Sequence, residues 1–457
     1  MWKNITNKME ILQSKDTTKK TAQELFSGKS INENELDNIM ELLFTNKKNK
    51  IINNTLTSQI DLFSDKINYF SDKIDSNDIF LRYINKTKTL IGRKKMIDIL
   101  KNPTNNIEIL QNRQNIINQF LTNDTKKITD ILNNISDIEK DILWLWKPQS
   151  NEYEYLLNSV YFRNQYLKFI NNNEVLMNII TMFKIVFAPI YVILQPIIMI
   201  ILPYIYLKFF SGVRISFGVY FRLVKFSFFN INPLASQSNS QRSKLSKYVS
   251  TIMSIIFYVQ GLFNAIESSK FTNTIINEMH SFISKIFTFI SLSNDLKDEV
   301  VKFTKDIKIS LPVIFSSINC HQFKTNNHIL SNKGKILICF NEITENKNKL
   351  IDYLKFVSNI DQIMAVINLK ENNNYSLSKI IKSKTPVLNI KNMWNPLIGE
   401  ENSVKNSIDI GSSNPNNVIV TGPNAGGKTT FIKTLCLQVL LSQTLTITSS
   451  DSLKISP

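Results

Sequence analysis

The stretch of sequence that decides the fold spans residues 418–441 and reads VIVTGPNAGGKTTFIKTLCLQVLL. Its segment Gly422–Thr429 matches the phosphate-loop pattern G-x-x-x-x-G-K-[ST] without a mismatch. The β-branched run Val418–Val420 before the loop predicts a buried strand. Beyond the loop, apolar residues recur every fourth position, which predicts a helix that buries one face. These residues are Phe431, Leu435 and Val439, and Ile432, Cys436 and Leu440.

A strand, a glycine-rich loop and a helix in this order can hold a nucleotide phosphate. The glycines let successive backbone N–H groups point at phosphate oxygens, and the helix N-terminus adds its partial positive charge. We expect Lys428 to reach the β- and γ-phosphates, and the Thr429 hydroxyl to join waters and phosphate oxygens around Mg²⁺. The expected ligands are therefore ATP and Mg²⁺. The expected binding residues are Gly422, Pro423, Asn424, Ala425, Gly426, Gly427, Lys428, Thr429 and Thr430.

The composition is that of a folded chain with a basic surface. Its 457 residues suffice for two or three domains, and 43% hydrophobic with 20% charged residues excludes a disordered chain. Only 11 Gly and 12 Pro favour helices over a turn-rich all-β fold, although codon bias in an A/T-rich genome explains the same bias. The net charge of +17 suits a nucleic-acid or anionic-membrane partner. A generally solvated basic surface is the alternative.

The cysteines and the N-terminus indicate a reduced, non-secreted protein. Cys320, Cys339 and Cys436 lie far apart and have no zinc-site spacing with the three histidines. The first residues contain no apolar signal core.

An uncharged stretch between Lys184 and Lys208 predicts a membrane segment. Residues 185–207 are almost wholly apolar and long enough to cross a hydrocarbon layer of roughly 30 Å. Three prolines interrupt the run, which a membrane helix tolerates when neighbours satisfy the freed carbonyls. A buried core helix is the alternative. The prolines are Pro189, Pro196 and Pro203.

Two neighbouring segments extend this hypothesis. Residues 211–230 alternate basic and aromatic side chains, which suits an interface with anionic headgroups, or else a half-buried helix. Residues 248–266 form a second uncharged stretch, either a weaker span or a core helix. If the regions before and after the membrane pack together, either this stretch spans back or residues 185–207 re-enter, bent near Gln195–Pro196. We expect the re-entrant form, with the basic residues at the cytoplasmic face.

The remaining chain reads as mainly helical. Helical spacing marks residues 35–44, and a helix should open at Leu90 and stop near Pro103. A second helix should carry an apolar stripe at Ile107, Leu110, Ile116, Ile117 and Phe120. Trp144–Trp146 is expected in the core. A strand is expected at residues 336–340, an amphipathic helix at 350–367, a loop at 370–374 and a β-containing domain from Val387.

The predicted fold class is thus mainly α, with a membrane segment, followed by the start of an α/β P-loop ATPase domain. The expected divisions are a helical N-terminal region at 1–80, core helices at 81–170, a membrane-associated segment at 171–231, a linker at 232–247, a helical core and lever region at 248–370, and the first part of the ATPase domain at 371–457.

The phosphate loop resembles that of the MutS mismatch-repair ATPases, which typically carry TGPN-x-x-GK-[ST]. Thr421, Pro423 and Asn424 match beyond the general loop pattern. Residues 394–398, WNPLI, resemble the entry to the family's ATPase domain, with Trp-Asn in place of the usual His. The segment 404–408 resembles the one whose apolar side chain lies against adenine, which makes Val404 the candidate for that contact.

The likeness extends to two earlier segments. Residues 90–121 resemble the start of the MutS core domain, and residues 353–366, with Asp361, resemble its lever helix. The matching positions in the first segment are Gly92, Arg93, Pro103, Arg113 and Gln114. The resemblance implies an ATP-binding protein that contacts the sugar-phosphate backbone of mismatched or branched DNA. It also implies a homodimer, formed through the ATPase domain, that clamps this DNA.

The departures from the family also shape the expectation. The first 80 residues contain no Phe-x-Glu for mismatch reading, and the apolar block is similar to that of membrane-segment-containing MutS-related proteins of bacteria and large DNA viruses. The family's acidic Mg²⁺-orienting strand would follow Pro457, so we expect a truncated or split ATPase that does not hydrolyse ATP alone. We expect membrane association with the ATPase side cytoplasmic, or in a viral factory or host cytoplasm if the chain is viral. The alternative function is a non-repair membrane ATPase, a scaffold, or a fragment without hydrolytic activity.

Overall fold

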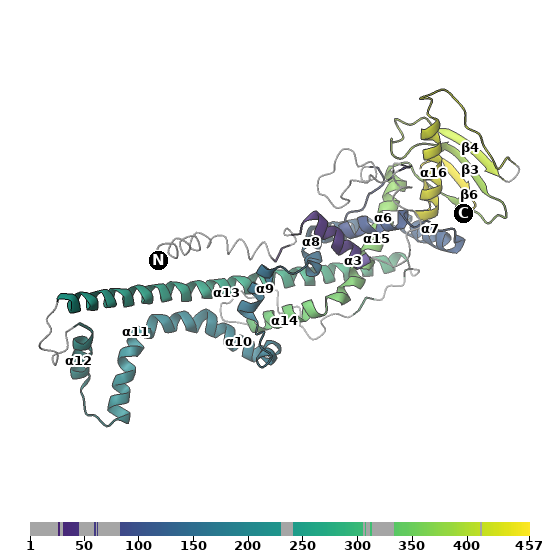
Figure 1. The fold of residues 1–457 in the computed structure, drawn as a ribbon. Coiled ribbons are helices and arrows are strands. Elements are labelled where there is room, and N and C mark those ends of the chain that lie inside the picture. The colour runs from purple at the N-terminus through teal and green to yellow at the C-terminus, as the bar shows by residue number, and fades with distance from the viewer. Residues whose placement is uncertain are drawn as a thin grey trace. The chain divides into compact units, whose positions relative to one another are not determined.

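The computed structural model describes residues 26–27, 31–44, 59–60, 62, 83–229, 241–304, 307, 311–312, 333–411 and 414–457. Its described part is mainly α with a small sheet (Figure 1). The chain forms two compact units. Of the described residues, one unit contains 149–229, 241–281 and 333–342, and the other contains those between 26 and 148, 282–304, 307, 311–312, 343–411 and 414–457. We call them the helical unit and the α/β unit.

The helical part of the α/β unit follows the sequence prediction closely. It contains α3 (Glu33–Phe44), α6 (Leu90–Leu100), α7 (Ile107–Leu121), α8 (Lys126–Leu143) and α15 (Leu350–Asn372). The short helix η2 (Trp144–Trp146) is buried, and the Trp144 ring packs edge-on against Phe282 at 5.0 Å. The expected helix starts and the core position of the tryptophans are confirmed. Another short helix, η7 (Lys347–Lys349), precedes α15. Because α15 continues to Asn372, the loop expected at residues 370–374 begins only at Asn373.

Two buried carboxylates hold the N-terminus of α6. Asp361 on α15 accepts the Thr89 backbone N–H at 2.8 Å and the Thr89 hydroxyl at 2.6 Å. Glu139 on α8 accepts the N–H groups of Leu90 and Ile91, both at 2.7 Å. The first N–H groups of a helix have no partner within the helix, so acceptors from other helices must satisfy them. The two carboxylates therefore join three helices at one point.

Gly92 is required by this joint. A Cβ at Gly92 would lie 2.0 Å from an oxygen of Asp361. The α6–α15 contact thus has room only for glycine, which gives a physical reason for the Gly92 and Asp361 positions noted in the sequence.

The sheet of the α/β unit has four strands in the order β2-β6-β3-β4. The strands β2 (Lys379–Ile380) and β6 (Ser452–Ile455) are parallel, whereas β3 (Val387–Met393) is antiparallel to both β6 and β4 (Asn406–Gly411). A separate pair joins β1 (Ser376–Leu377) to β5 (Ile447–Thr448). Helix α16 (Lys428–Thr444) lies against the sheet (Figure 1).

One apolar cluster ties sheet, α16 and α7 together. Its buried members are Leu110, Ile380, Ile390, Met393, Leu453 and Ile455. Partly buried residues packed on it include Phe431, Leu435 and Val439 of α16. One of the two predicted stripes of α16 is therefore the packing face. In the other stripe only Leu440 is buried, because Ile432 is 48% exposed and Cys436 is exposed.

The helical unit contains α9 (Asn151–Val160), η3 (Lys168–Asn172) and a continuous helix over Glu174–Phe210, built from α10 (Glu174–Met182), η4 (Phe183–Phe187), α11 (Ala188–Ile205) and η5 (Tyr206–Phe210). This helix is long and apolar enough to cross a membrane. It is followed by α12 (Phe217–Phe229). Helices α13 (Gln241–Phe303) and α14 (Lys333–Glu345) begin in this unit and end in the α/β unit.

Two expectations for these helices are wrong. Residues 336–340, predicted as a strand, lie inside α14, where Leu337, Phe340 and Ile343 are buried. Their spacing of three is helical, whereas a short apolar run alone does not separate strand from helix. Residues 241–247, expected at the end of a linker, form the first turns of α13; the rest of that linker lies outside the described residues.

We predict that the α6 joint makes stability fall as the pH rises. Burial raises the pKa of Glu139 to about 7, above the value of about 4.3 for a glutamate in an unfolded chain. The folded chain therefore holds a proton that the unfolded chain releases, and this stabilisation is present below about pH 4.3 and lost as the pH rises through about 7.

The measurement is urea unfolding of the full chain in detergent between about pH 5 and 8. The free energy of unfolding should fall by up to roughly 3 kcal/mol, and Glu139→Gln should remove most of this fall. Glu108→Gln, at an exposed position of α7, is the control. An unchanged pH dependence in Glu139→Gln would contradict the assignment.

Candidate nucleotide-binding site

The phosphate loop is reached through an exposed segment, not through the predicted strand. Residues Val418–Val420 form no strand, and Ile419 is 88% exposed. The prediction of a buried strand here is wrong. A β-branched run becomes a strand only where a neighbouring strand offers N–H and C=O partners, and the four described strands of the sheet are paired among themselves.

The loop folds tightly between Gly422 and Lys428. Gly427 has φ +79° and Ala425 has φ +63°, both in the left-handed region. The Gly426 N–H donates to the Pro423 carbonyl at 3.1 Å, and a Cβ at Gly426 would lie 3.0 Å from that same oxygen. Gly427, with its positive φ, lets the chain turn directly into α16. Gly426, which has no Cβ, lets the loop stay close to the Pro423 carbonyl.

Lys428 folds back across the loop that it follows. Its Nζ donates to the Gly422 carbonyl at 2.7 Å and to the Pro423 carbonyl at 2.6 Å. The ammonium therefore lies over the loop, at the N-terminus of α16, where the first N–H groups lack acceptors within the helix. A cation and several backbone donors gather at one exposed point, which is the arrangement that attracts a phosphate group.

The other predicted residues surround this point unequally. Asn424, Thr429 and Thr430 are exposed along the loop and the first turn of α16. A Thr429 hydroxyl at this position can ligate a metal ion that is bound to phosphate oxygens. Val404, the candidate for the adenine contact, lies just before β4 with its side chain 82% exposed.

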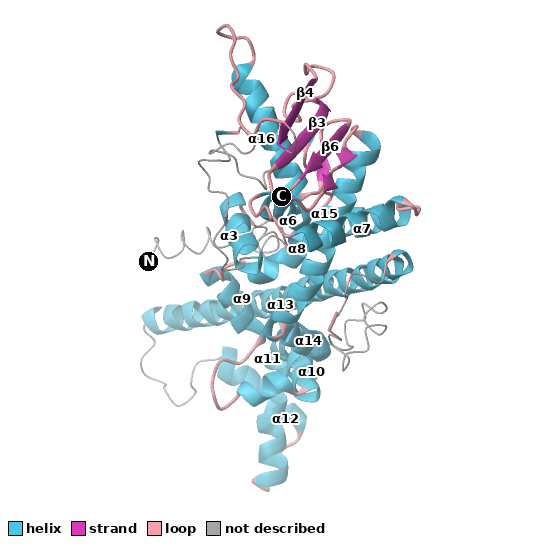
Figure 2. Ribbon diagram, turned by 90° about the vertical axis from the view of Figure 1, so that its right-hand side faces the viewer, coloured by secondary structure: helices cyan, strands magenta, loops and turns pink. Residues whose placement is uncertain are grey.

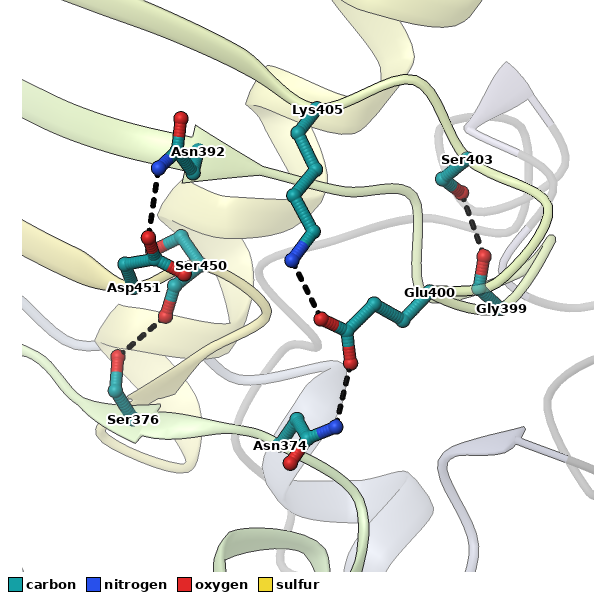
Figure 3. Close-up of polar contacts among 9 residues, drawn as sticks. All are labelled: Asn374, Ser376, Asn392, Gly399, Glu400, Ser403, Lys405, Ser450 and Asp451. Atoms are coloured by element: carbon teal, nitrogen blue, oxygen red, sulfur yellow. Dashed lines mark hydrogen bonds and ion pairs between the residues drawn. The ribbon is translucent and has the colours of Figure 1, made fainter.

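The turn before Val404 is held by polar contacts (Figure 3). Glu400 accepts from Lys405 Nζ at 2.6 Å and from Asn374 Nδ2 at 2.6 Å. The hydrogen bond from Lys405 is the main reason that the pKa of Glu400 is lowered. The Ser403 hydroxyl donates to the Gly399 carbonyl at 2.7 Å. The segment carrying Val404 is thus fixed at its base.

The C-terminal half of α16 is anchored by a buried glutamine. The Gln438 amide nitrogen donates to the Ser449 hydroxyl at 2.7 Å and to the Trp394 carbonyl at 3.2 Å. Its oxygen accepts from the Thr448 hydroxyl at 2.8 Å and the Ser449 N–H at 2.9 Å. Gln438 is fully buried. The apolar stripes of this helix do not predict the role of Gln438, whose signal in the sequence is a polar side chain among apolar neighbours.

Core helix α7 also contacts the end of α16. Arg113 Nη1 donates to the Thr444 carbonyl at 2.5 Å, and Gln114 Nε2 donates to the Ser378 carbonyl at 2.5 Å. The last carbonyls of a helix lack partners within it and favour a cation. Of the Arg-Gln pair, noted in the sequence only as a resemblance, Arg113 thus fastens α7 to the helix that carries the loop, and Gln114 fastens it to the segment between β1 and β2.

The loop end of α16 is free of this packing. In Figure 2 the N-terminal end of α16 and its loop extend beyond the strands. The residues of the loop are exposed, whereas the last eight residues of α16 are mostly buried. The phosphate loop is therefore presented to solvent on a helix that is fixed at its far end.

Comparison with known proteins supports a relationship to the MutS family over about a quarter to half of the chain. The chain is 25% identical over 241 residues to the DNA mismatch repair protein MSH3 of Debaryomyces hansenii, which covers 48% of this chain and 22% of that protein. It is 33% identical over 111 residues to the DNA mismatch repair protein MutS of Caldanaerobacter subterraneus, covering 23% and 12%.

A third relative is the endonuclease MutS2 of Ligilactobacillus salivarius, 31% identical over 117 residues, which cover 26% of this chain and 14% of that protein. No family model matches the chain. The matched parts therefore span less than a quarter of these relatives' own lengths.

We predict that Gln438→Leu weakens the attachment of α16 to the sheet. The substitution keeps the volume but leaves the Ser449 N–H and the Trp394 carbonyl without this partner, which should cost roughly 3 kcal/mol in the free energy of unfolding. Gln443→Leu, at a half-buried position of the same helix, is the control and should change it by less than about 1 kcal/mol. Equal effects of the two substitutions in urea melts would contradict the anchoring role.

Proposed function

We propose that this chain is a MutS-like ATP-binding protein that binds Mg²⁺-ATP on the loop Gly422–Thr429. The observation that carries the proposal is the position of Lys428 Nζ over the loop carbonyls at the N-terminus of α16. In the bound state the ammonium exchanges these carbonyls for phosphate oxygens, and the Thr429 hydroxyl ligates the metal. A Mg²⁺ ion held there by Thr429 would supply charge neutralisation of the phosphates.

The contacts of α16 support coupling between nucleotide and core. One end of this helix carries the phosphate loop, and its other end is held by Arg113 from α7. A rigid helix transmits a displacement at its loop to the helix that holds its far end. We propose that ATP binding on the loop changes the position of the core helices, and that two copies clamp DNA through their ATPase domains.

DNA is the proposed second partner. The relatives' names refer to DNA mismatch repair, and the net charge of +17 suits contacts to phosphates. We propose backbone contacts to mismatched or branched DNA, without assigning the residues that read a base.

Membrane association is the proposed setting of the helical unit. The helix Glu174–Phe210 is long and apolar enough to cross a bilayer. Its side chains are widely exposed, among them Ile193, Ile197, Met199 and Leu202 at 51–65%. An exposed apolar surface of this extent marks a membrane or a partner. This exposure also favours the second candidate function, a non-repair membrane ATPase or scaffold, and DNA binding separates the two.

We predict that Lys428→Ala lowers the affinity for Mg²⁺-ATP by at least about tenfold, because the variant loses one charge-assisted contact worth roughly 1.5–3 kcal/mol. The measurement is titration of the full chain with a fluorescent ATP analogue. Lys391→Ala, at an exposed position of β3, removes the same charge elsewhere and should bind as the parent does. Equal affinities of all three proteins would overturn the proposal.

We predict salt-sensitive binding to duplex DNA. With about six phosphate contacts, affinity should fall roughly a thousandfold between about 50 and 200 mM salt. The measurement is fluorescence anisotropy of a labelled branched duplex with the full chain in detergent. Absence of binding even at low salt would exclude the DNA-clamping function and leave the membrane ATPase or scaffold.

A further inference from the structure

The three prolines of the apolar helix recur at intervals of seven residues. Pro189 is the second residue of α11, directly after η4, and Pro196 and Pro203 lie further inside α11. A proline offers no N–H to the carbonyl four residues earlier, and its ring pushes that turn open. Carbonyls three and four residues before each proline are therefore accessible to another donor. In the hydrocarbon layer of a membrane, no water is available as that hydrogen-bond donor.

At each of these turns a hydroxyl from another helix donates to such a carbonyl. The Ser269 hydroxyl donates to the Ile185 carbonyl at 2.6 Å, four residues before Pro189. The Tyr258 hydroxyl donates to the Ile193 carbonyl at 3.1 Å, three residues before Pro196. The Tyr220 hydroxyl donates to the Ile200 carbonyl at 2.9 Å, three residues before Pro203.

Two of these donors belong to α13 and fix its direction. From Ile185 to Ile193 the acceptors advance along the chain, while the donors go back from Ser269 to Tyr258. Helix α13 therefore runs antiparallel to the first part of the apolar helix, alongside it, and the later part of α11 turns away from α13 (Figure 1). The third donor comes from α12, whose Tyr220 is buried.

The part of α13 next to these contacts is apolar around its circumference. Ile255, Ile256 and Phe257 are consecutive and 51–62% exposed. Consecutive residues of an α-helix point in directions about 100° apart, so this segment is not covered by the described chain on the side away from α11. Residues 248–266 contain no charged residue, with Lys247 and Glu267 at their ends. Their 19 positions span roughly 30 Å, the thickness of a hydrocarbon layer.

We propose that residues 248–266 of α13 are a second membrane-embedded arm, packed antiparallel on the first part of the helix Glu174–Phe210. The hydroxyls of Ser269 and Tyr258 clamp the two arms at the first two proline turns, and Tyr220 of α12 contacts the third turn in the same way. The occupant of the exposed surface is lipid. A protein partner would cover one face, whereas both arms expose apolar side chains widely and turn their hydroxyls inward onto backbone carbonyls. This inference rests on the proposed membrane association, and it replaces the re-entrant bend with two arms.

Two single cysteines test the arms separately. In the full chain with Cys320, Cys339 and Cys436 replaced by Ala, Ile197→Cys reports on the first arm and Ile256→Cys on the second. Tyr166→Cys, 86% exposed in the helical unit, is the accessible control. The proteins are reconstituted into vesicles of phosphatidylcholine and phosphatidylglycerol and treated with a membrane-impermeant maleimide.

Both arms should react at least about tenfold more slowly than the control, because water and reagent are excluded from the hydrocarbon. Protection of Ile197→Cys with full labelling of Ile256→Cys would overturn the second arm and leave the membrane association standing. Full labelling of both would overturn the membrane association itself.

The clamp is tested by a double-mutant cycle. Tyr258→Phe removes the hydroxyl and should raise labelling of Ile256→Cys by roughly threefold, the effect of one interhelical hydrogen bond in a membrane. In a Pro196→Ala background the restored N–H bonds to the Val192 carbonyl and the turn closes, so that the Ile197 N–H takes the Ile193 carbonyl and Tyr258→Phe should then have little effect. Tyr191→Phe, an exposed tyrosine on α11, is the control. An equal effect of Tyr258→Phe in both backgrounds would overturn the clamp and reduce Tyr258 to a packing residue.

Discussion

The structure depends on one constraint, which is that backbone groups left unpaired at helix ends and helix breaks must find a partner. The free N–H groups at the start of α6 are taken by Glu139 and by Asp361. The last carbonyls of α16 are taken by Arg113. The proline turns of the apolar helix receive hydroxyls from α12 and α13. In each case the donor or acceptor comes from a distant part of the sequence, so each contact also fixes tertiary structure.

The same constraint explains the candidate site. Helix α16 is buried and hydrogen-bonded at its C-terminal half, where Gln438 contacts Trp394 and Ser449. At its other end no carboxylate of the described residues is bonded to the N–H groups, and Lys428 Nζ donates to the loop's own carbonyls. The site therefore combines a fixed helix with backbone donors that face solvent.

Sequence patterns predicted the local elements well and the long-range ones poorly. Helices α6, α7 and α15 follow from apolar spacing and from Pro103, which are properties of neighbouring residues. The strand expected at Val418–Val420 failed because a strand needs a partner that its own residues do not encode. The run at 336–340 failed because five apolar residues fit both a strand and a helix. The loop residues were identifiable from their motif, whereas the roles of Gln438, Arg113 and Tyr258 depend on which distant groups they meet.

The central claim is that the backbone amides between Gly422 and Thr430 enclose a nucleotide phosphate. Hydrogen exchange of the full chain with and without Mg²⁺-ATP tests it most directly, read by mass spectrometry on peptides that cover residues 421–431. The account predicts slower exchange in these peptides when the nucleotide is present, and no such slowing in Lys428→Ala. Exchange in this loop that Mg²⁺-ATP leaves unchanged would contradict it.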